Sequence, residues 1–313
     1  MTTTTAPFGK LMTAMITPMA ADGAIDYDGM ARLAAYLVDD MRSEGLVVSG
    51  TTGEAPTTTD AEKQRLIEVV KDAVGDRASV VAGVGTNITA HSVELAKQAE
   101  RAGADGLLVV SPYYSKPAQD ALAAHFTAIA DSTGLPMLIY DIPGRTAVAL
   151  ATDTLVGLAG HPRIVGIKDA KGDIAASSAV IARTDLAYYS GDDPMTLPLL
   201  SVGGIGIISV TAHVVGPRIS AMLDAFADGN NAEARQHHLS MLPVNVGLFR
   251  NQAAVMTKAA MDLLGLPGGG VRGPLLPASE AERSTLTDDL TAGGVKLPAA
   301  GEARATSMNG ATL

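Results

Sequence analysis

The feature that most constrains the fold is a regular alternation, from residue 11 onward, between short apolar runs and longer segments with helical periodicity. This alternation is typical of repeated βα units around a parallel sheet. The expected strands lie at 11–19, 46–50, 79–85, 106–112, 136–143, 164–170, 187–193 and 205–212. The expected helices lie at 28–42, 60–74, 90–102, 118–132, 152–159, 174–183, 195–202 and 217–228, with Asp60 as the N-cap of the second. Eight strands, each followed by a helix, predict an α/β fold, the (β/α)8 TIM barrel.

The region after the eighth unit has a different pattern. Helical periodicity continues at 232–250, 253–265 and 278–292, with a Gly/Pro-rich break between the last two. We therefore expect four parts, namely an N-terminal tail (1–10), the barrel (11–230), a C-terminal helical lobe (231–294) and a flexible tail (295–313). A doubly wound sheet is the alternative, but its glycine fingerprint is missing, because 83–85 supplies only Gly-Val-Gly after the third strand.

Composition limits the possible partners and the cellular location. Hydrophobic residues make up 47% of the 313 residues and charged residues 18%, which is enough to build a buried core. The net charge of −10 argues against nucleic acid as a partner, and no apolar run approaches the roughly 20 residues of a membrane span. The chain has no cysteine, and its first ten residues lack the apolar segment of a signal peptide. We expect a globular, cytoplasmic protein.

Polar residues at the ends of the expected strands are the first candidates for function, since the active site of such a barrel lies at the carboxyl ends of its strands. Residues 50–54 (Gly-Thr-Thr-Gly-Glu) follow the second strand and place the hydroxyls of Thr51 and Thr52 at the mouth. Two hydroxyls and free backbone N–H groups suit a carboxylate ligand. The alternative is an ordinary turn, where Thr and Gly are common.

The fifth strand places Tyr140 near its carboxyl end and is followed by Arg145. A tyrosine can relay protons, and an arginine can hold a carboxylate through two hydrogen bonds. The alternatives are a packing tyrosine and a solvated arginine.

The sixth strand is apolar but contains Lys168 near its end. Burial of a lysine lowers its pKa and favours the neutral amine that condenses with a carbonyl. From spacing alone, a lysine that extends to solvent or pairs with Asp169 is also possible.

Two further pairs lie at the mouth. Tyr113 and Tyr114 follow the fourth strand and either close the site or stack at an oligomer interface. Asp192 and Asp193 end the seventh strand, and without a histidine at matching spacing we interpret them as an N-cap for the next helix. We expect no metal.

Together these segments resemble the dihydrodipicolinate synthase and N-acetylneuraminate lyase superfamily of class I, Schiff-base aldolases, over residues 11 to about 290. The matching segments are 50–54, 112–114 (Pro-Tyr-Tyr), 140–146 (Tyr-Asp-Ile-Pro-Gly-Arg-Thr), 166–169 (Gly-Ile-Lys-Asp), and 191–193 (Gly-Asp-Asp) followed by 206–210 (Gly-Ile-Ile-Ser-Val). Within the superfamily the chain is most similar to the synthases that condense pyruvate with L-aspartate 4-semialdehyde in diaminopimelate and lysine biosynthesis. Arg145 and the threonine pair favour this branch.

The resemblance implies a role for each of these residues. Lys168 forms the Schiff base with pyruvate, Thr51 and Thr52 hold its carboxylate, and Arg145 binds the carboxylate of the aldehyde. Tyr140, Thr51 and Tyr114 relay protons, with Tyr114 supplied by a neighbouring subunit of a tetramer made of two tight dimers. Gly191 and Ile208 contribute backbone carbonyls near the reacting centre. No cofactor is needed.

The sequence departs from the family pattern in two places. Asp141 stands where many relatives have asparagine and is expected to add a carboxylate near the mouth. Lys63 and His91 stand where lysine-inhibited relatives often have His and Glu, so we expect weak or absent inhibition by L-lysine. Two other functions remain open, namely an aldolase or lyase for a 2-keto-3-deoxy sugar acid, and a barrel that binds a keto acid without catalysis.

Overall fold

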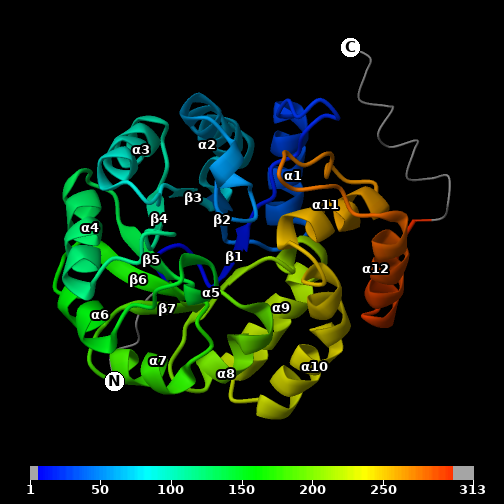
Figure 1. Cartoon of the computed structure of the whole chain (residues 1–313). Helices are drawn as coiled ribbons and strands as arrows, with labels where there is room; N and C mark the ends of the chain where they lie inside the picture. Colours follow the sequence, from blue (N-terminus) through cyan, green and yellow to red (C-terminus); the bar gives the residue numbers. More distant parts are fainter. Residues whose placement is uncertain (1–5, 299–313) are drawn as a thin grey trace.

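The structure, a computed structural model, describes residues 6–298 and contains a closed barrel of eight parallel strands in sequence order, with β8 paired to β1 (Figure 1). The strands are β1 Leu11–Ala14, β2 Gly45–Val48, β3 Ser79–Gly83, β4 Gly106–Val110, β5 Met137–Asp141, β6 Ile164–Asp169, β7 Ala187–Ser190 and β8 Gly206–Ser209. Most of their residues are buried on both faces, which explains why the strands are almost continuously apolar in sequence.

Helices surround the strands, and the predicted α/β barrel with an added C-terminal helical region is confirmed (Figure 1). The ring contains α1 Tyr27–Asp39, α2 Asp60–Val74, α3 Thr89–Arg101, α4 Gln119–Asp131, α6 Thr152–Leu158, α7 Ile174–Ile181, α8 Thr196–Leu200 and α9 Ala212–Ala227. A one-turn helix, α5 Pro143–Thr146, follows β5. The added helices are α10 Asn231–Leu248, α11 Ala253–Leu263 and α12 Glu280–Ala292, of which α10 packs against α9 and α12.

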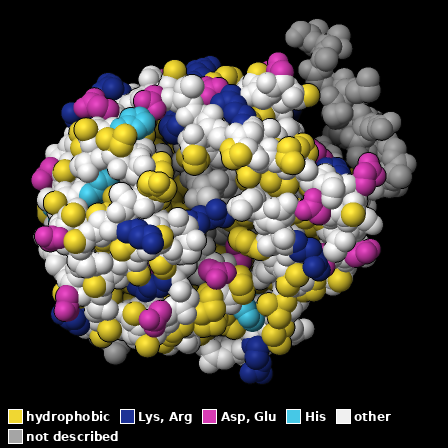
Figure 2. All heavy atoms as spheres, in the orientation of Figure 1, with side chains coloured by type: hydrophobic (Ala, Val, Ile, Leu, Met, Phe, Trp, Pro, Cys, Tyr) yellow, Lys and Arg dark blue, Asp and Glu magenta, His cyan; other side chains and the backbone are white. Residues whose placement is uncertain are grey.

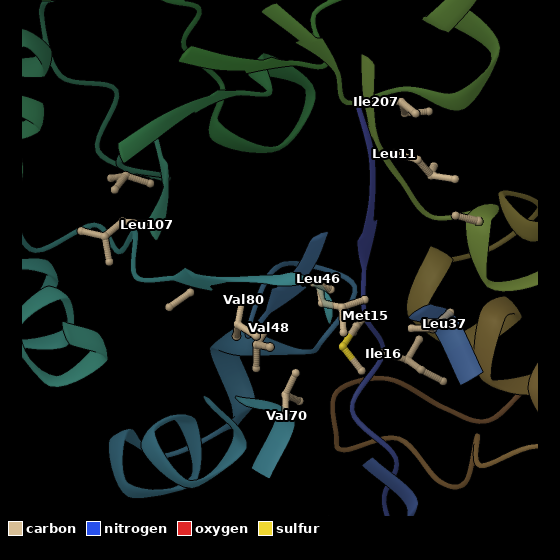
Figure 3. Close-up of a cluster of buried hydrophobic side chains, with 14 of the residues drawn as sticks. Leu11, Met15, Ile16, Leu37, Leu46, Val48, Val70, Val80, Leu107 and Ile207 are labelled. Carbon is tan, nitrogen blue, oxygen red and sulfur yellow. The ribbon is translucent and has the colours of Figure 1, made fainter. Parts of the chain in front are cut away.

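The core has two layers because successive residues of each strand point to opposite faces. The larger layer fills the space between strands and helices, where Val48 of β2, Val80 of β3 and Val70 of α2 point toward one another (Figure 3). The smaller layer fills the barrel interior and includes Val47 and Tyr189. Packing on both faces fixes the register, since a shift by one residue would exchange the two layers.

All eight expected strands are too long at their carboxyl ends. The first was expected at 11–19, but β1 ends at Ala14, and the apolar residues Met15 and Ile16 are buried in the loop that follows. Loops at the mouth of a packed barrel bury apolar side chains too, so hydrophobicity does not mark the end of the strand. The helix expected at 217–228 also begins earlier, at Ala212, with a kink at Val215.

The predicted N-cap of α2 is wrong by one residue. Thr59 caps the helix, because its hydroxyl accepts a hydrogen bond from the Glu62 N–H and its own N–H donates to the Glu62 carboxylate. This reciprocal arrangement satisfies two free donors, whereas Asp60 occupies the first helical turn.

The expected N-terminal tail is only partly tested. Residues 1–5 lie outside the described residues. Phe8 is 3% exposed and packs in the barrel interior, so the segment 6–10 is held against the barrel, whereas a loose tail was expected. Of the expected C-terminal tail, 299–313 lie outside the described residues, and the rest includes Val295 and Leu297 packed against the core. The division of the chain into domains remains a prediction. Within residues 6–298, no helix is long and apolar enough to cross a membrane.

Candidate active site

A cavity of about 380 Å³ opens at the mouth of the barrel. Among its lining residues are Thr51 after β2, Tyr113 after β4, Tyr140 on β5 and Arg145 in α5. Figure 2 shows the face in the orientation of Figure 1, with basic and acidic side chains near its centre. The loops after β2 and β5, far apart in the sequence, therefore share one site, as the strand-end argument predicts.

Lys168 lies next to this cavity, inside the barrel. On β6, Lys168 is paired in register with Tyr140 on β5 and Tyr189 on β7. Lys168 is only 4% exposed. Its Nζ lies 4.2 Å from the centre of the Tyr140 ring. The side chain neither extends to solvent nor pairs with Asp169, whose carboxylate points to the opposite face of β6 and accepts from Ser177.

Gly191 makes room for this lysine. A Cβ atom at position 191 would lie 2.9 Å from the Lys168 Cγ, closer than non-bonded carbon atoms approach one another. The predicted Gly191 therefore has a steric role next to Lys168, in addition to the backbone carbonyl that the resemblance implies.

Burial lowers the pKa of the Lys168 amine. Desolvation lowers the pKa of Lys168 from 10.5 to about 8; Asp193 opposes this shift and Arg145 adds to it. A shift of this size gives about 300-fold more neutral amine at pH 7. The neutral amine is the nucleophile for a carbonyl group, so this environment favours imine formation.

Tyr140 is held as a neutral phenol. Burial raises its pKa to about 12, while the charge of Arg145 and the Thr51 side chain lower it. The Arg145 Nη2 donates to Gln252 Oε1 at the start of α11, over 3.2 Å. A neutral phenol beside an amine can both donate and accept a proton during an imine reaction.

The threonine loop is anchored by the residue that ends it. Glu54 has left-handed backbone angles (φ 56°, ψ 37°), and its buried carboxylate pairs with Lys258 of α11. Its second oxygen accepts from the Arg272 N–H at 3.0 Å. Thr17 Oγ1 donates to the Gly53 carbonyl at 2.8 Å. Lys258 and Arg272 could not be identified from the sequence, because these two partners lie 204 and 218 residues from Glu54.

Tyr114 is not brought to the site within one chain. It is 89% exposed, with φ of +75°, and Tyr113 lines the cavity instead. Ile208 is 1% exposed and packs in the barrel interior. Thr52 is buried beside Thr51.

The predicted N-cap is confirmed in position only. Asp192 is the N-cap residue of the short 3₁₀ helix Asp193–Met195, but its side chain forms no capping bond. Asp193 accepts from Ser209, from the Thr211 hydroxyl at 2.5 Å and from the Val210 N–H at 3.1 Å. These bonds hold the end of β8 and the loop after it, which is a role across strands that local spacing could not reveal.

The expectation that Asp141 adds a carboxylate at the mouth is also wrong. Its side chain is fully buried on the outer face of β5, where it accepts from the Leu150 N–H and pairs with Lys171. Tyr140 occupies the inner face, so strand alternation excludes Asp141 from the cavity.

Fold and site together define a (β/α)8 barrel with a buried amine beside a phenol at its mouth. Residues 7–293 match the model of the Dihydrodipicolinate synthetase family. The chain is 59% identical to 4-hydroxy-tetrahydrodipicolinate synthase of Acidothermus cellulolyticus, over 92% of this chain and 94% of that protein. It is 57% identical to 4-hydroxy-tetrahydrodipicolinate synthase 2 of Streptomyces coelicolor, over 93% of this chain and 97% of that protein.

Solved structures give the same result. The crystal structure of the Cyanidioschyzon merolae enzyme with lysine bound superposes with a TM-score of 0.91 at 40% identity, covering 93% of this chain and all of that one. The chain belongs to the dihydrodipicolinate synthetase family.

Replacing Lys168 by Met should stabilise the protein at neutral pH. The folded state lowers the pKa of this lysine, so the cost of burying its ammonium is fully present below about pH 8. We expect a gain of at most about 3 kcal/mol at pH 7, decreasing as the pH rises from about 8 to 10.5. Urea unfolding at several pH values measures it, with the exposed Lys97→Met as control. A gain that grows with pH would contradict the interpretation.

Replacing Lys258 by Met should destabilise the protein, because it leaves the Glu54 carboxylate buried without a counter-ion. We expect a loss of about 3–5 kcal/mol in the free energy of unfolding. Lys71→Met removes the half-exposed pair with Asp105 and should cost about 1 kcal/mol or less. Equal losses in the two variants, measured by urea unfolding, would show that the Glu54 pair has no special role.

Proposed function

We propose that this chain acts as a 4-hydroxy-tetrahydrodipicolinate synthase, condensing pyruvate with L-aspartate 4-semialdehyde in diaminopimelate and lysine biosynthesis. The observation that carries the proposal is the Lys168 amine, buried and 4.2 Å from the centre of the Tyr140 ring beside a cavity at the barrel mouth. The identity of 50–59% to relatives with this name supports the same activity.

The first half of the reaction joins pyruvate to Lys168. The neutral amine attacks the ketone carbon, and loss of water from the resulting carbinolamine gives an imine. Thr51, Thr52 and the backbone N–H groups of their loop hold the pyruvate carboxylate. Tyr140, whose pKa is influenced by the Thr51 side chain, delivers the proton that leaves with water. The methyl group then loses a proton, and the electrons of that C–H bond form a carbon–carbon double bond while the electrons of the imine double bond move to its nitrogen. The product is an enamine. Because the imine nitrogen accepts these electrons, no cofactor is required.

In the second half, the enamine carbon attacks the aldehyde and forms a carbon–carbon bond. The substrate's own amine then displaces Lys168 and closes the ring. Arg145 binds the aldehyde's carboxylate, because its guanidinium lines the cavity and is oriented by Gln252. Gly191 and Ile208 contribute backbone carbonyls near the reacting centre.

The proton relay is completed by a second subunit. Tyr114 is 89% exposed at the edge of the mouth, where a tyrosine of one chain is free to enter the site of another. We place it in the relay of a neighbouring subunit, within a tetramer of two tight dimers. The cytoplasmic location also remains a prediction.

Reduction with borohydride in the presence of pyruvate tests the proposal. Intact mass should increase by one reduced pyruvate adduct, peptide mapping should locate it on Lys168, and Lys168→Ala should show none. Absence of the adduct in the unmodified chain would refute the proposal and favour a barrel that binds a keto acid without catalysis. A steady-state comparison of aldehydes completes the test, since a higher kcat/KM with a sugar-acid aldehyde than with aspartate semialdehyde would favour the sugar-acid aldolase.

L-lysine should inhibit this enzyme weakly or not at all. The cavity extends to Lys63, whose ammonium donates to the Thr58 carbonyl, and to His91, which pairs with Asp60 at 2.9 Å. The Lys63 ammonium repels the ammonium groups of the amino acid. Initial rates with increasing L-lysine measure the effect, and Lys63→Gln should bind the amino acid more tightly than the unmodified chain. Half-inhibition at sub-millimolar L-lysine would refute this prediction.

A further inference from the structure

A buried cation lies behind the reactive pair, on the outer face of the barrel. The Lys171 Nζ lies 3.5 Å from Asp141 Oδ2 and 3.6 Å from Asp169 Oδ2, and the three side chains are 7%, 0% and 4% exposed. Asp141 belongs to β5 and Asp169 to β6, so one ammonium group connects two adjacent strands.

The two carboxylates follow the catalytic residues directly. In the register of β5 and β6, Tyr140 is opposite Lys168 and Asp141 is opposite Asp169. Successive strand residues point to opposite faces, so the first pair faces the cavity and the second faces the helices. Any change in the separation of Asp141 and Asp169 therefore moves the backbone that holds Tyr140 and Lys168.

The turn after β6 holds the ammonium group in place. The Lys171 N–H donates to Asp169 Oδ1 at 2.9 Å, and the other oxygen of Asp169 accepts from Ser177 of α7 at 2.6 Å. Gly172, with φ of +73°, continues the turn in a conformation that side chains rarely adopt. Lys171 is therefore oriented by its own backbone and has little freedom to leave the carboxylates.

We propose that Lys171 is a positioning residue for imine formation, because its ammonium holds Asp141 and Asp169 together and thereby fixes the Tyr140 ring beside the Lys168 amine. The inference rests on the proposed function, since it assigns Lys171 a role in the reaction of Lys168 with pyruvate.

The electrostatics explain why the cation is needed. Burial raises the pKa of Asp141 to about 6, Lys171 and the Leu150 N–H lower it, and Asp169 raises it. Tyr188 faces the two carboxylates from β7, and its pKa is raised by burial and by their charges, while α7 contributes the uncharged Ser177. Without Lys171, two buried carboxylates on paired positions repel each other unless one takes up a proton.

The test is the rate of adduct formation with pyruvate and borohydride, measured for Lys171→Met relative to the unmodified chain at each pH. We expect about tenfold slower trapping at pH 8, with the ratio returning toward one as the pH falls and a carboxyl group is protonated. The double variant Asp141→Asn with Lys171→Met removes the repulsion, so its trapping rate should recover to within about threefold at every pH. Lys71→Met, which breaks the Lys71–Asp105 pair, is the matched control and should trap at the unmodified rate.

The outcomes separate this inference from the proposed function. If the unmodified chain forms no adduct, the proposed function fails. If the unmodified chain forms the adduct, two results refute the positioning role. One is a trapping rate of Lys171→Met equal to that of the unmodified chain at every pH. The other is a trapping rate of the double variant as low as that of Lys171→Met. If Lys171→Met does not fold, as judged by circular dichroism, Lys171→Gln replaces it, because the amide removes the charge and keeps a polar end beside the carboxylates. Lys171→Gln should then slow trapping with the same dependence on pH, and an unchanged rate at every pH would refute the proposal.

Discussion

The burial of the Lys168 side chain is the condition on which the rest of the site depends. A closed, packed barrel provides an interior of low polarity, and desolvation of the ammonium there lowers its pKa more than any neighbouring charge does. The surroundings preserve this effect, since Gly191 gives the side chain space and the Tyr140 ring lies beside its amine. A carboxylate in direct contact would restore the cation, and the nearest chain neighbour, Asp169, faces the other way.

Two ion pairs that the fold buries lie outside this interior. Asp169 and Lys171 sit between strands and helices, while Glu54 and Lys258 sit between the barrel and α11. Each pair is satisfied where it lies, which avoids the large penalty of an unpaired buried charge. The barrel wall thus separates these two ion pairs from the Lys168 amine, to which we assign the reaction with pyruvate.

The sequence predicts the parts of this arrangement that follow from local pattern. Eight apolar runs with amphipathic connections determine the barrel, and polar residues at strand ends identify Thr51, Tyr140 and Lys168 as neighbours. The ends of the strands were not predictable, because loops at the mouth are as apolar as the strands that they follow. Asp141 was placed on the wrong face, although alternation from Tyr140 would have corrected it. Lys258 could not be found, since nothing near Glu54 in the sequence indicates its partner.

The long separation between Glu54 and Lys258 also sets the order in which the site is built. During synthesis the threonine loop leaves the ribosome well before α11 is made. Until α11 is made, Lys258 is not available to offset the cost of burying the Glu54 carboxylate. Its left-handed backbone, unfavourable for a residue with a side chain, is held by contacts that arrive last. The threonine loop therefore receives its last anchors only after the C-terminal helices have been synthesised and have docked.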